Sequence, residues 1–193
     1  MKVERRTFKV ELRKSADGRK IRGTAVVFNQ LSVDLGGFRE QIAPEAFDGC
    51  DMTDVRCLVN HEATRILGRT ASNTLSLAKE ASGLCFECDP PDTSYARDLA
   101  ACMDRGDIDL CSFSFRVAPK GDRWSKDPET GAQIRTVRKI SRLYDVSVVT
   151  YAAYPQTSIE IRSSAEILSE RQPAGESTPS DVLRCQVELA QLG

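Results

Sequence analysis

A serine, a histidine and an acidic residue, spread along the chain, are the residues best suited to chemistry. Serine-nucleophile catalysis needs a hydroxyl, a base that removes its proton, and a group that orients the base and stabilises its charged form. Ser112 and His61 could supply the first two. Because His61 is the only histidine in 193 residues, the third group must be a carboxylate, and any mechanism or metal site that needs two histidines is excluded.

Asp145 is the most attractive carboxylate for this role. It is the lone charge in the apolar run 143–149. A carboxylate that is buried without a partner is costly, and an imidazolium would be such a partner. The alternative is that Asp145 faces solvent from an edge strand. Spacing alone leaves both interpretations open.

A zinc site is the rival use of the same histidine. Cys57 and His61 are separated by three residues, and Cys85 and Cys88 by two, which together make a plausible Cys3His ligand set. Zinc knuckles usually turn between their paired cysteines. Cys85 and Cys88 instead lie in an apparent strand with no glycine between them.

The segment 106–117 is the element that must position Ser112. It begins with a Gly-Asp turn and continues as an alternating run rich in aromatic residues, which predicts a strand. Side chains of a strand point alternately to its two faces. One predicted face therefore carries Leu110, Ser112 and Ser114, and the other carries Cys111, Phe113, Phe115 and Val117. The simpler interpretation is a half-buried strand whose serines face water.

Two further strands must carry the other candidates. Residues 55–61 read as a strand that ends on the polar pair Asn60 and His61, and residues 140–154 as a last core strand that includes Asp145. The surrounding sequence predicts a hairpin of 3–12 with 21–28 and a strand pair of 75–79 with 83–88. It also predicts an exposed hairpin or loop over 119–137, with Gly131 at its tip. Residues 93–105 form the best helix, with an apolar stripe of Ala96, Leu99, Ala100 and Met103.

Composition bounds the class of protein. With 40% hydrophobic and 28% charged residues and a net charge of −1, the chain resembles a globular domain with tails and gives no global reason to expect a nucleic-acid partner. No apolar run approaches the roughly 20 residues that span a bilayer, and the charged first six residues predict no signal peptide. The seven irregularly spaced cysteines are expected to be reduced thiols, most of them buried.

About eight strands and one clear helix predict a mainly β protein with helices (α+β), built as a barrel or sandwich. This domain is expected to span 1–162. From residue 163 the composition changes, and 172–180 is rich in Pro, Ala, Gly, Glu, Ser and Thr. We expect 163–193 to be a flexible C-terminal tail.

A series of short motifs resembles the prohead (capsid maturation) proteases of tailed bacteriophages of the HK97 type. They occur in that family's order over roughly residues 20–157. In chain order they are 23–28 (GTAVVF), 38–47 (FREQIAPEAF), 58–62 (LVNHE), 67–70 (LGRT), 83–84 (GL), 106–108 (GDI), 111–115 (CSFSF), 143–150 (LYDVSVVT) and 153–155 (AYP).

The resemblance implies an assemblin-like closed β-barrel of about seven or eight strands surrounded by a few helices. It also implies a serine endopeptidase with Ser112 as nucleophile, His61 as base and Asp145 as the third member. Ser114 stands where the family usually has glycine, so this second hydroxyl on the same face is also a candidate nucleophile. Assemblins carry an arginine pair after the last of these strands, which is missing here, and backbone N–H groups near 150–152 are the alternative oxyanion donors.

The implied substrates are the scaffolding region of the major capsid protein and the protease's own tail, cut between 163 and 180. Cleavage would occur inside the assembling prohead, in the cytoplasm of the bacterial host. Assemblins act as dimers, which suggests a homodimer here. No cofactor, metal, membrane or nucleic acid is expected, and Cys57, Cys85 and Cys88 then become core positions. The alternative is a scaffold or assembly protein of the same fold that binds capsid protein without cutting it.

Overall fold

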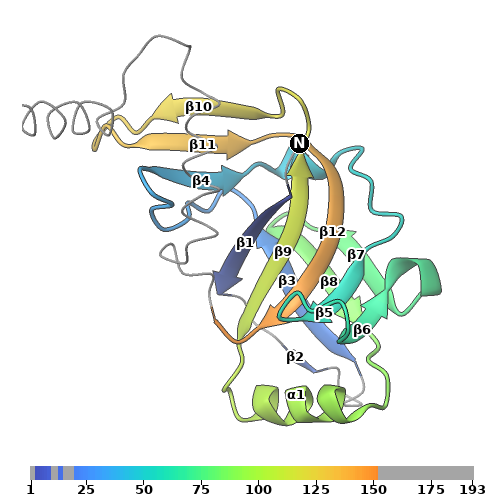
Figure 1. Ribbon diagram of the computed structural model, residues 1–193. Coiled ribbons are helices and arrows are strands. Elements are labelled where there is room, and N and C mark those ends of the chain that lie inside the picture. Colours follow the sequence, from blue (N-terminus) through green and yellow to red (C-terminus); the bar gives the residue numbers. More distant parts are fainter. Residues whose placement is uncertain (1–2, 10–12, 15–19, 152–193) are drawn as a thin grey trace, which may run out of the picture.

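The structure is a computed structural model that describes residues 3–9, 13–14 and 20–151 (Figure 1). This part of the chain forms twelve strands, one α-helix and two short 3-10 helices. The strands pair into three sheets, of five, four and three strands. The prediction of a mainly β fold with helices is therefore confirmed.

The five-stranded sheet contains the strand predicted around Ser112. Its order is β1 (Glu4–Lys9), β9 (Leu110–Val117), β12 (Ile140–Val149), β5 (Arg56–Val59) and β6 (Ile66–Arg69). The last strand in sequence, β12, lies in the middle of the sheet, antiparallel to β9 and parallel to β5. It therefore joins the β1–β9 pair to the β5–β6 pair.

The four-stranded sheet is antiparallel throughout. Its order is β2 (Arg13–Lys14), β3 (Ile21–Val27), β8 (Gly83–Cys88) and β7 (Leu75–Lys79), so the predicted pairing of 75–79 with 83–88 is confirmed. The register of β3 against β8 shifts between Thr24 and Val26. A Cβ atom on Gly83 would lie 2.0 Å from the Val26 carbonyl oxygen, so only glycine fits at this close approach.

The three-stranded sheet extends to one side of the molecule, at the upper left of Figure 1. It consists of β10 (Asp122–Lys126), β11 (Gln133–Val137) and β4 (Phe38–Ile42). β10 and β11 form the predicted hairpin, with Gly131 in the left-handed conformation (φ +70°) between them. β11 also pairs in parallel with β4.

A buried ion cluster connects this small sheet to β1. Arg135, which is 4% exposed, donates hydrogen bonds to Glu4 (2.6 Å), Glu40 (2.8 Å) and Asp122 (2.7 Å). Arg6 donates to Glu40 at 2.7 Å. Burial opposes the ionisation of Glu4, but the two arginines outweigh it and hold the pKa of that carboxyl below its ordinary value. Each buried charge of this cluster is therefore paired with a group of opposite charge.

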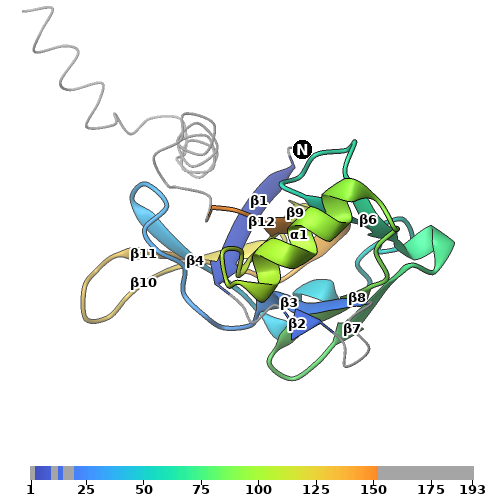
Figure 2. The same cartoon turned by 90° about the horizontal axis from the view of Figure 1, so that it is seen from below.

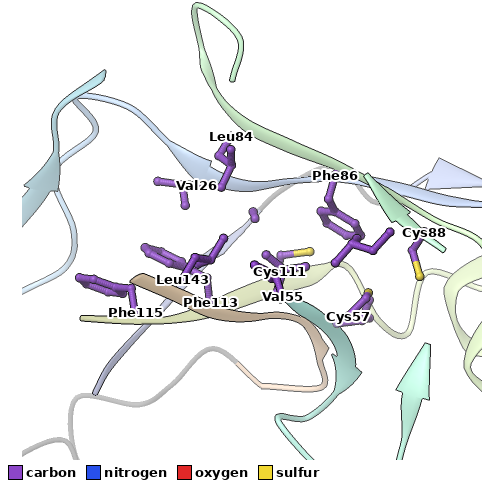
Figure 3. Packing of buried hydrophobic residues seen from close by; sticks show 14 of the residues in the cluster. Val26, Val55, Cys57, Leu84, Phe86, Cys88, Cys111, Phe113, Phe115 and Leu143 are labelled. Atoms are coloured by element: carbon purple, nitrogen blue, oxygen red, sulfur yellow. The ribbon is translucent and has the colours of Figure 1, made fainter. Parts of the chain in front are cut away.

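The main core lies between the five-stranded and four-stranded sheets (Figure 3). The alternation in β9 directs Cys111, Phe113 and Phe115 into it, and none of the three is exposed. The rings of Phe113 and Phe115 stack with their centroids 4.8 Å apart. Figure 3 shows Val26, Leu84, Phe86 and Cys88 facing these residues from the other sheet. Burial of so much apolar surface is what fixes the orientation of β9.

The helix α1 (Ser94–Asp104) lies across the end of the molecule that is lowest in Figure 1 and nearest the viewer in Figure 2. Its predicted apolar stripe packs inward, with Ala96 and Leu99 buried. The 3-10 helices are η1 (Pro44–Phe47) and η2 (Thr70–Ser72). Among the residues that the structure describes, no helix is both long and apolar enough to span a membrane.

One prediction about strand pairing is wrong, and the prediction of a closed barrel is not confirmed. The first predicted strand, β1, pairs with β9 and not with β3, so the hairpin of 3–12 with 21–28 is wrong; β3 pairs with the short β2 instead. The predicted closed barrel is not found in the described part of the chain, where the strands divide into three sheets. Alternation of residues gives a strand its two faces but does not identify its partners. The predicted tail, 163–193, lies outside the described residues.

Candidate active site

The face of the five-stranded sheet that points away from the main core carries polar side chains in its two central strands. The register pairs Ser112 of β9 with Ser147 of β12, and Ser114 with Asp145. We call these four residues the polar face. They are 1%, 0%, 2% and 7% exposed, respectively, so the interpretation in which the serines of this strand face water is wrong. Buried polar groups of this kind need hydrogen-bond partners.

His61 reaches this face from the turn after β5. The turn closes with a hydrogen bond from the Glu62 N–H to the Val59 carbonyl oxygen (2.9 Å). Its two central residues, Asn60 and His61, both adopt the left-handed conformation, with φ of +52° and +58°. Such a turn reverses the chain tightly at the end of β5, which is paired with β12. The imidazole is therefore held next to the strand that carries Asp145.

The structure brings the three candidate catalytic residues together. The His61 Nε2 atom lies 2.7 Å from Ser112 Oγ, and the His61 Nδ1 atom lies 2.6 Å from Asp145 Oδ1. With Nδ1 protonated and donating to the carboxylate, Nε2 is free to accept the serine proton. This arrangement could perform the proton transfer that activates a serine hydroxyl for acyl transfer.

Asp145 is held in its ionised form by its neighbours. Burial raises its pKa, but the hydrogen bond and charge of His61, with hydrogen bonds from Ser147 and Ser114, outweigh that effect and lower the pKa below the ordinary value of 3.8. Ser147 Oγ donates to Asp145 Oδ1 at 2.7 Å. The carboxylate can therefore both orient the imidazole and stabilise its positive charge.

Ser114 lies on the other side of the imidazole from Ser112. Its Oγ atom is 3.3 Å from His61 Nδ1, the nitrogen that contacts Asp145, whereas Ser112 Oγ contacts Nε2. The nitrogen that is available to accept a proton therefore faces Ser112. This contrast favours Ser112 over Ser114 as the hydroxyl that reacts.

The N-terminal strand also contributes to the site, which sequence reasoning missed. Ser112 Oγ lies 3.0 Å from the Arg6 carbonyl oxygen, to which it can donate, and Arg5 Nε donates to Ser114 Oγ at 3.2 Å. Ser147 was missed too, although the alternation of 143–149 already put it on the same face as Asp145. No signal in the sequence linked β1 to β9, because the two contacts span more than one hundred residues.

One group expected near the oxyanion is already engaged. The Thr150 N–H donates to the Asn60 side-chain oxygen at 2.9 Å. Tyr151, the last residue of the described segment, is exposed, and residue 152 lies outside that segment. The expectation that backbone N–H groups near 150–152 bind the oxyanion therefore finds no support at Thr150.

The four residues of the alternative zinc site do not form a metal cluster. Within the described residues no group of three or more His, Cys, Asp or Glu side chains is arranged to hold a metal ion. Cys57 and Cys88 are buried in the main core, and the contact with Cys88, together with burial, raises the pKa of Cys57 well above its ordinary value. Cys85 lies on another surface, 3.7 Å from Thr24 Oγ1. His61 is engaged by Ser112 and Asp145.

Comparison with known proteins gives one family match. The family model described as caudovirus prohead serine protease matches residues 6–170, which include Ser112, His61 and Asp145. Neither the search of curated proteins nor the search of solved structures found a match. Since the family model covers most of the chain, the protein belongs to the caudovirus prohead serine protease family.

Proposed function

We propose that this chain is a serine endopeptidase of phage head maturation in which Ser112 is the nucleophile, His61 the general base and Asp145 the residue that orients the base. One observation carries the assignment: the two ring nitrogens of His61 lie 2.7 Å from Ser112 Oγ and 2.6 Å from Asp145 Oδ1. Two such contacts, which link three residues in a row, are what a serine nucleophile requires.

The reaction proceeds through an acyl-enzyme. Ser112 Oγ attacks the scissile carbonyl carbon while its proton passes to His61 Nε2. The C–N bond then breaks as Nε2 gives that proton to the leaving amine. A water molecule, deprotonated by the same nitrogen, attacks the ester, and the proton returns to Ser112 as the acid product leaves. Throughout these steps Asp145 holds the Nδ1–H and offsets the charge of the imidazolium.

The resting site is closed to a peptide. Ser112 is only 1% exposed, and Arg5 and Arg6 of β1 contact the two serines of β9. A scissile carbonyl therefore reaches the hydroxyl only after the groups around it, which include the Arg6 backbone carbonyl, move. This burial supports a protease that rests in an inactive form until a substrate segment opens the site.

The substrates that the family suggests are the scaffolding region of the major capsid protein and the protease itself. Cleavage takes place inside the assembling prohead, in the host cytoplasm, before DNA enters. The catalytic domain spans 1–162, and 163–193 is the self-processing tail, cut between 163 and 180. The richness of 172–180 in small and polar residues and proline supports a segment that can enter an active site in extended form. A homodimer, by analogy with assemblins, is part of the proposal.

Kinship with assemblin, including its closed barrel, is also a proposal. Its support is the mainly β fold and a catalytic serine on a central strand. A closed barrel would require strand pairings between the three sheets, in addition to the pairings of the described strands. An experimental structure of the full chain tests it, and three sheets that remain separate there would exclude the closed barrel.

Intact-mass measurement after expression tests the proposed activity. We expect the wild-type protein to lose its C-terminal tail and to form a covalent adduct with a serine-directed phosphonate, whereas Ser112→Ala stays at 21.3 kDa and forms none. The matched control is Ser114→Ala, which removes the neighbouring hydroxyl and is expected to process itself and to react. Processing that persists in Ser112→Ala would exclude Ser112 as nucleophile. If the wild type neither processes itself nor reacts, co-expression with the capsid protein separates a protease that requires assembly from a non-enzymatic scaffold.

A further inference from the structure

Asn60 joins the histidine turn to the end of the strand that carries the acid. Its side-chain oxygen accepts a hydrogen bond from the Thr150 N–H at 2.9 Å, and its side-chain nitrogen lies 3.3 Å from Thr150 Oγ1. Its own backbone N–H donates to the Val148 carbonyl oxygen at 2.9 Å. One exposed residue thus binds β12 and the residue just beyond it through both its backbone and its side chain.

The backbone of this turn needs such support. Asn60 and His61 are consecutive non-glycine residues in the left-handed conformation, with φ of +52° and +58°. Asparagine tolerates this region better than most residues do, whereas for other side chains it costs roughly 1–2 kcal/mol per residue. Backbone conformations of this kind persist only where the surroundings determine them. The bonds from Asn60 to Val148 and Thr150 are those surroundings on the β12 side.

The distances around the imidazole explain why the position of the turn matters. His61 must meet Ser112, on β9, and Asp145, on β12, within 2.7 Å and 2.6 Å at the same time. His61 itself belongs to neither strand. Its ring can satisfy both contacts only if the turn stays at a fixed distance from β12, and Asn60 bonds the turn to β12 and Thr150 beyond the last paired residue of β5.

We propose that Asn60 is a positioning residue for His61, acting as a clamp between the histidine turn and Thr150. This inference rests on the proposed function, because it assumes that His61 is the base. Asn60 does not act on the substrate; it acts through the imidazole. Its loss slows acyl transfer because a displacement of about 1 Å in a catalytic group can cost about 100-fold in rate.

The variant Asn60→Gly separates the clamp from the backbone conformation. Glycine adopts the left-handed conformation without steric cost, so the turn is retained while the bonds to Thr150 are lost. Asn60→Asp keeps an oxygen acceptor for the Thr150 N–H and tolerates the same conformation. The matched control is Asn73→Gly, which makes the same substitution at another exposed left-handed asparagine (φ +58°) after η2, outside the residues that contact His61.

The measurement is the reaction of each full-length variant with a serine-directed phosphonate, which gives a maximal rate of inactivation, an inhibition constant and the fraction of molecules labelled. For Asn60→Gly we expect the maximal rate to fall about 10- to 100-fold, with an inhibition constant within about twofold of wild type and complete labelling at the end point. For Asn60→Asp we expect a maximal rate of inactivation within about fivefold of wild type. For Asn73→Gly we expect the same maximal rate as wild type.

The outcomes separate this inference from the proposed function. Wild-type protein that shows no adduct on Ser112, both alone and when co-expressed with the capsid protein, contradicts the proposed function itself. If wild type reacts, an unchanged maximal rate in Asn60→Gly overturns the clamp, and so does an Asn60→Asp variant as slow as Asn60→Gly. A lower labelled fraction at an unchanged rate would assign Asn60 a role in stability alone, which also contradicts positioning.

Discussion

Ser147 and His61 share one carboxylate oxygen. The Ser147 hydroxyl donates to Asp145 Oδ1 at 2.7 Å, and the same oxygen lies 2.6 Å from His61 Nδ1. Ser147 is fully buried and stands two residues after Asp145 on the same face of β12. The hydroxyl therefore fixes the orientation of the carboxylate from inside the sheet, while the imidazole contacts it from the turn.

Replacing Ser147 with Ala removes this internal hydrogen bond. A hydrogen bond to a charged group contributes about 1.5–3 kcal/mol, so we expect phosphonate inactivation to slow by about tenfold or more. The measurement is the rate of adduct formation on Ser112. Ser141→Ala is the control, because Ser141 lies on the same strand but donates to the Arg116 carbonyl oxygen, away from the site. Equal rates in the two variants would contradict the role of Ser147.

The lowered pKa of Asp145 predicts how stability depends on pH. A carboxyl whose pKa is lower in the folded than in the unfolded state stabilises the fold above its unfolded pKa, here near 3.8, and this contribution is lost as the pH falls through the folded value. We expect the free energy of unfolding, measured with urea, to fall less steeply below about pH 4 in Asp145→Asn than in wild type. Parallel curves for the two proteins would show that the pKa of Asp145 does not change on folding.

The buried ion cluster predicts a large effect far from the catalytic residues. Arg135→Ala removes one of the two arginines that contact Glu4 and Glu40, and breaking a buried ion pair in this way costs about 3–5 kcal/mol. Urea denaturation should show a loss of that size. The control is Arg138→Ala, which breaks an exposed pair with Glu45 and should cost no more than about 1 kcal/mol. Similar losses in both variants would mean that burial adds nothing to the cluster.

Buried thiols predict resistance to alkylation. Cys57, Cys88 and Cys111 are not exposed, so an alkylating reagent does not reach them in the folded protein. Burial also strongly raises the pKa of Cys111, which disfavours its reactive thiolate near neutral pH. Iodoacetamide should leave the folded protein active towards the phosphonate. After unfolding in urea, peptide mapping should find all three cysteines modified. Inactivation that parallels alkylation of Cys111 in the folded protein would point to a cysteine on the reaction path.

Local patterns in the sequence predicted the elements of the site better than their arrangement. Alternation predicted the strand of Ser112 and its phenylalanine face, because a period of two follows directly from strand geometry. The isolated charge in 143–149 singled out Asp145, which the structure places beside His61. In both cases the signal lay within about ten residues.

The partners of the strands could not be predicted in this way. The partner of β1 is β9, more than one hundred residues away, and the ion cluster that connects β1 to the three-stranded sheet draws on four strands. The sequence marked Asn60 only as the polar neighbour of His61, since its contacts depend on a left-handed turn and on the end of β12 lying beside it. Such contacts result from the packing of the whole chain, which one-dimensional patterns do not contain.

The central place of β12 in its sheet has a consequence for synthesis on the ribosome. The β1–β9 pair and the β5–β6 pair have no strand in common until Ile140–Val149 inserts between them. Because the chain emerges from its N-terminus, His61 and Ser112 are both synthesised well before the strand that brings them together. A nascent chain that ends before this strand therefore lacks Asp145, so the contacts that join Ser112, His61 and Asp145 can form only after Ile140–Val149 has been synthesised.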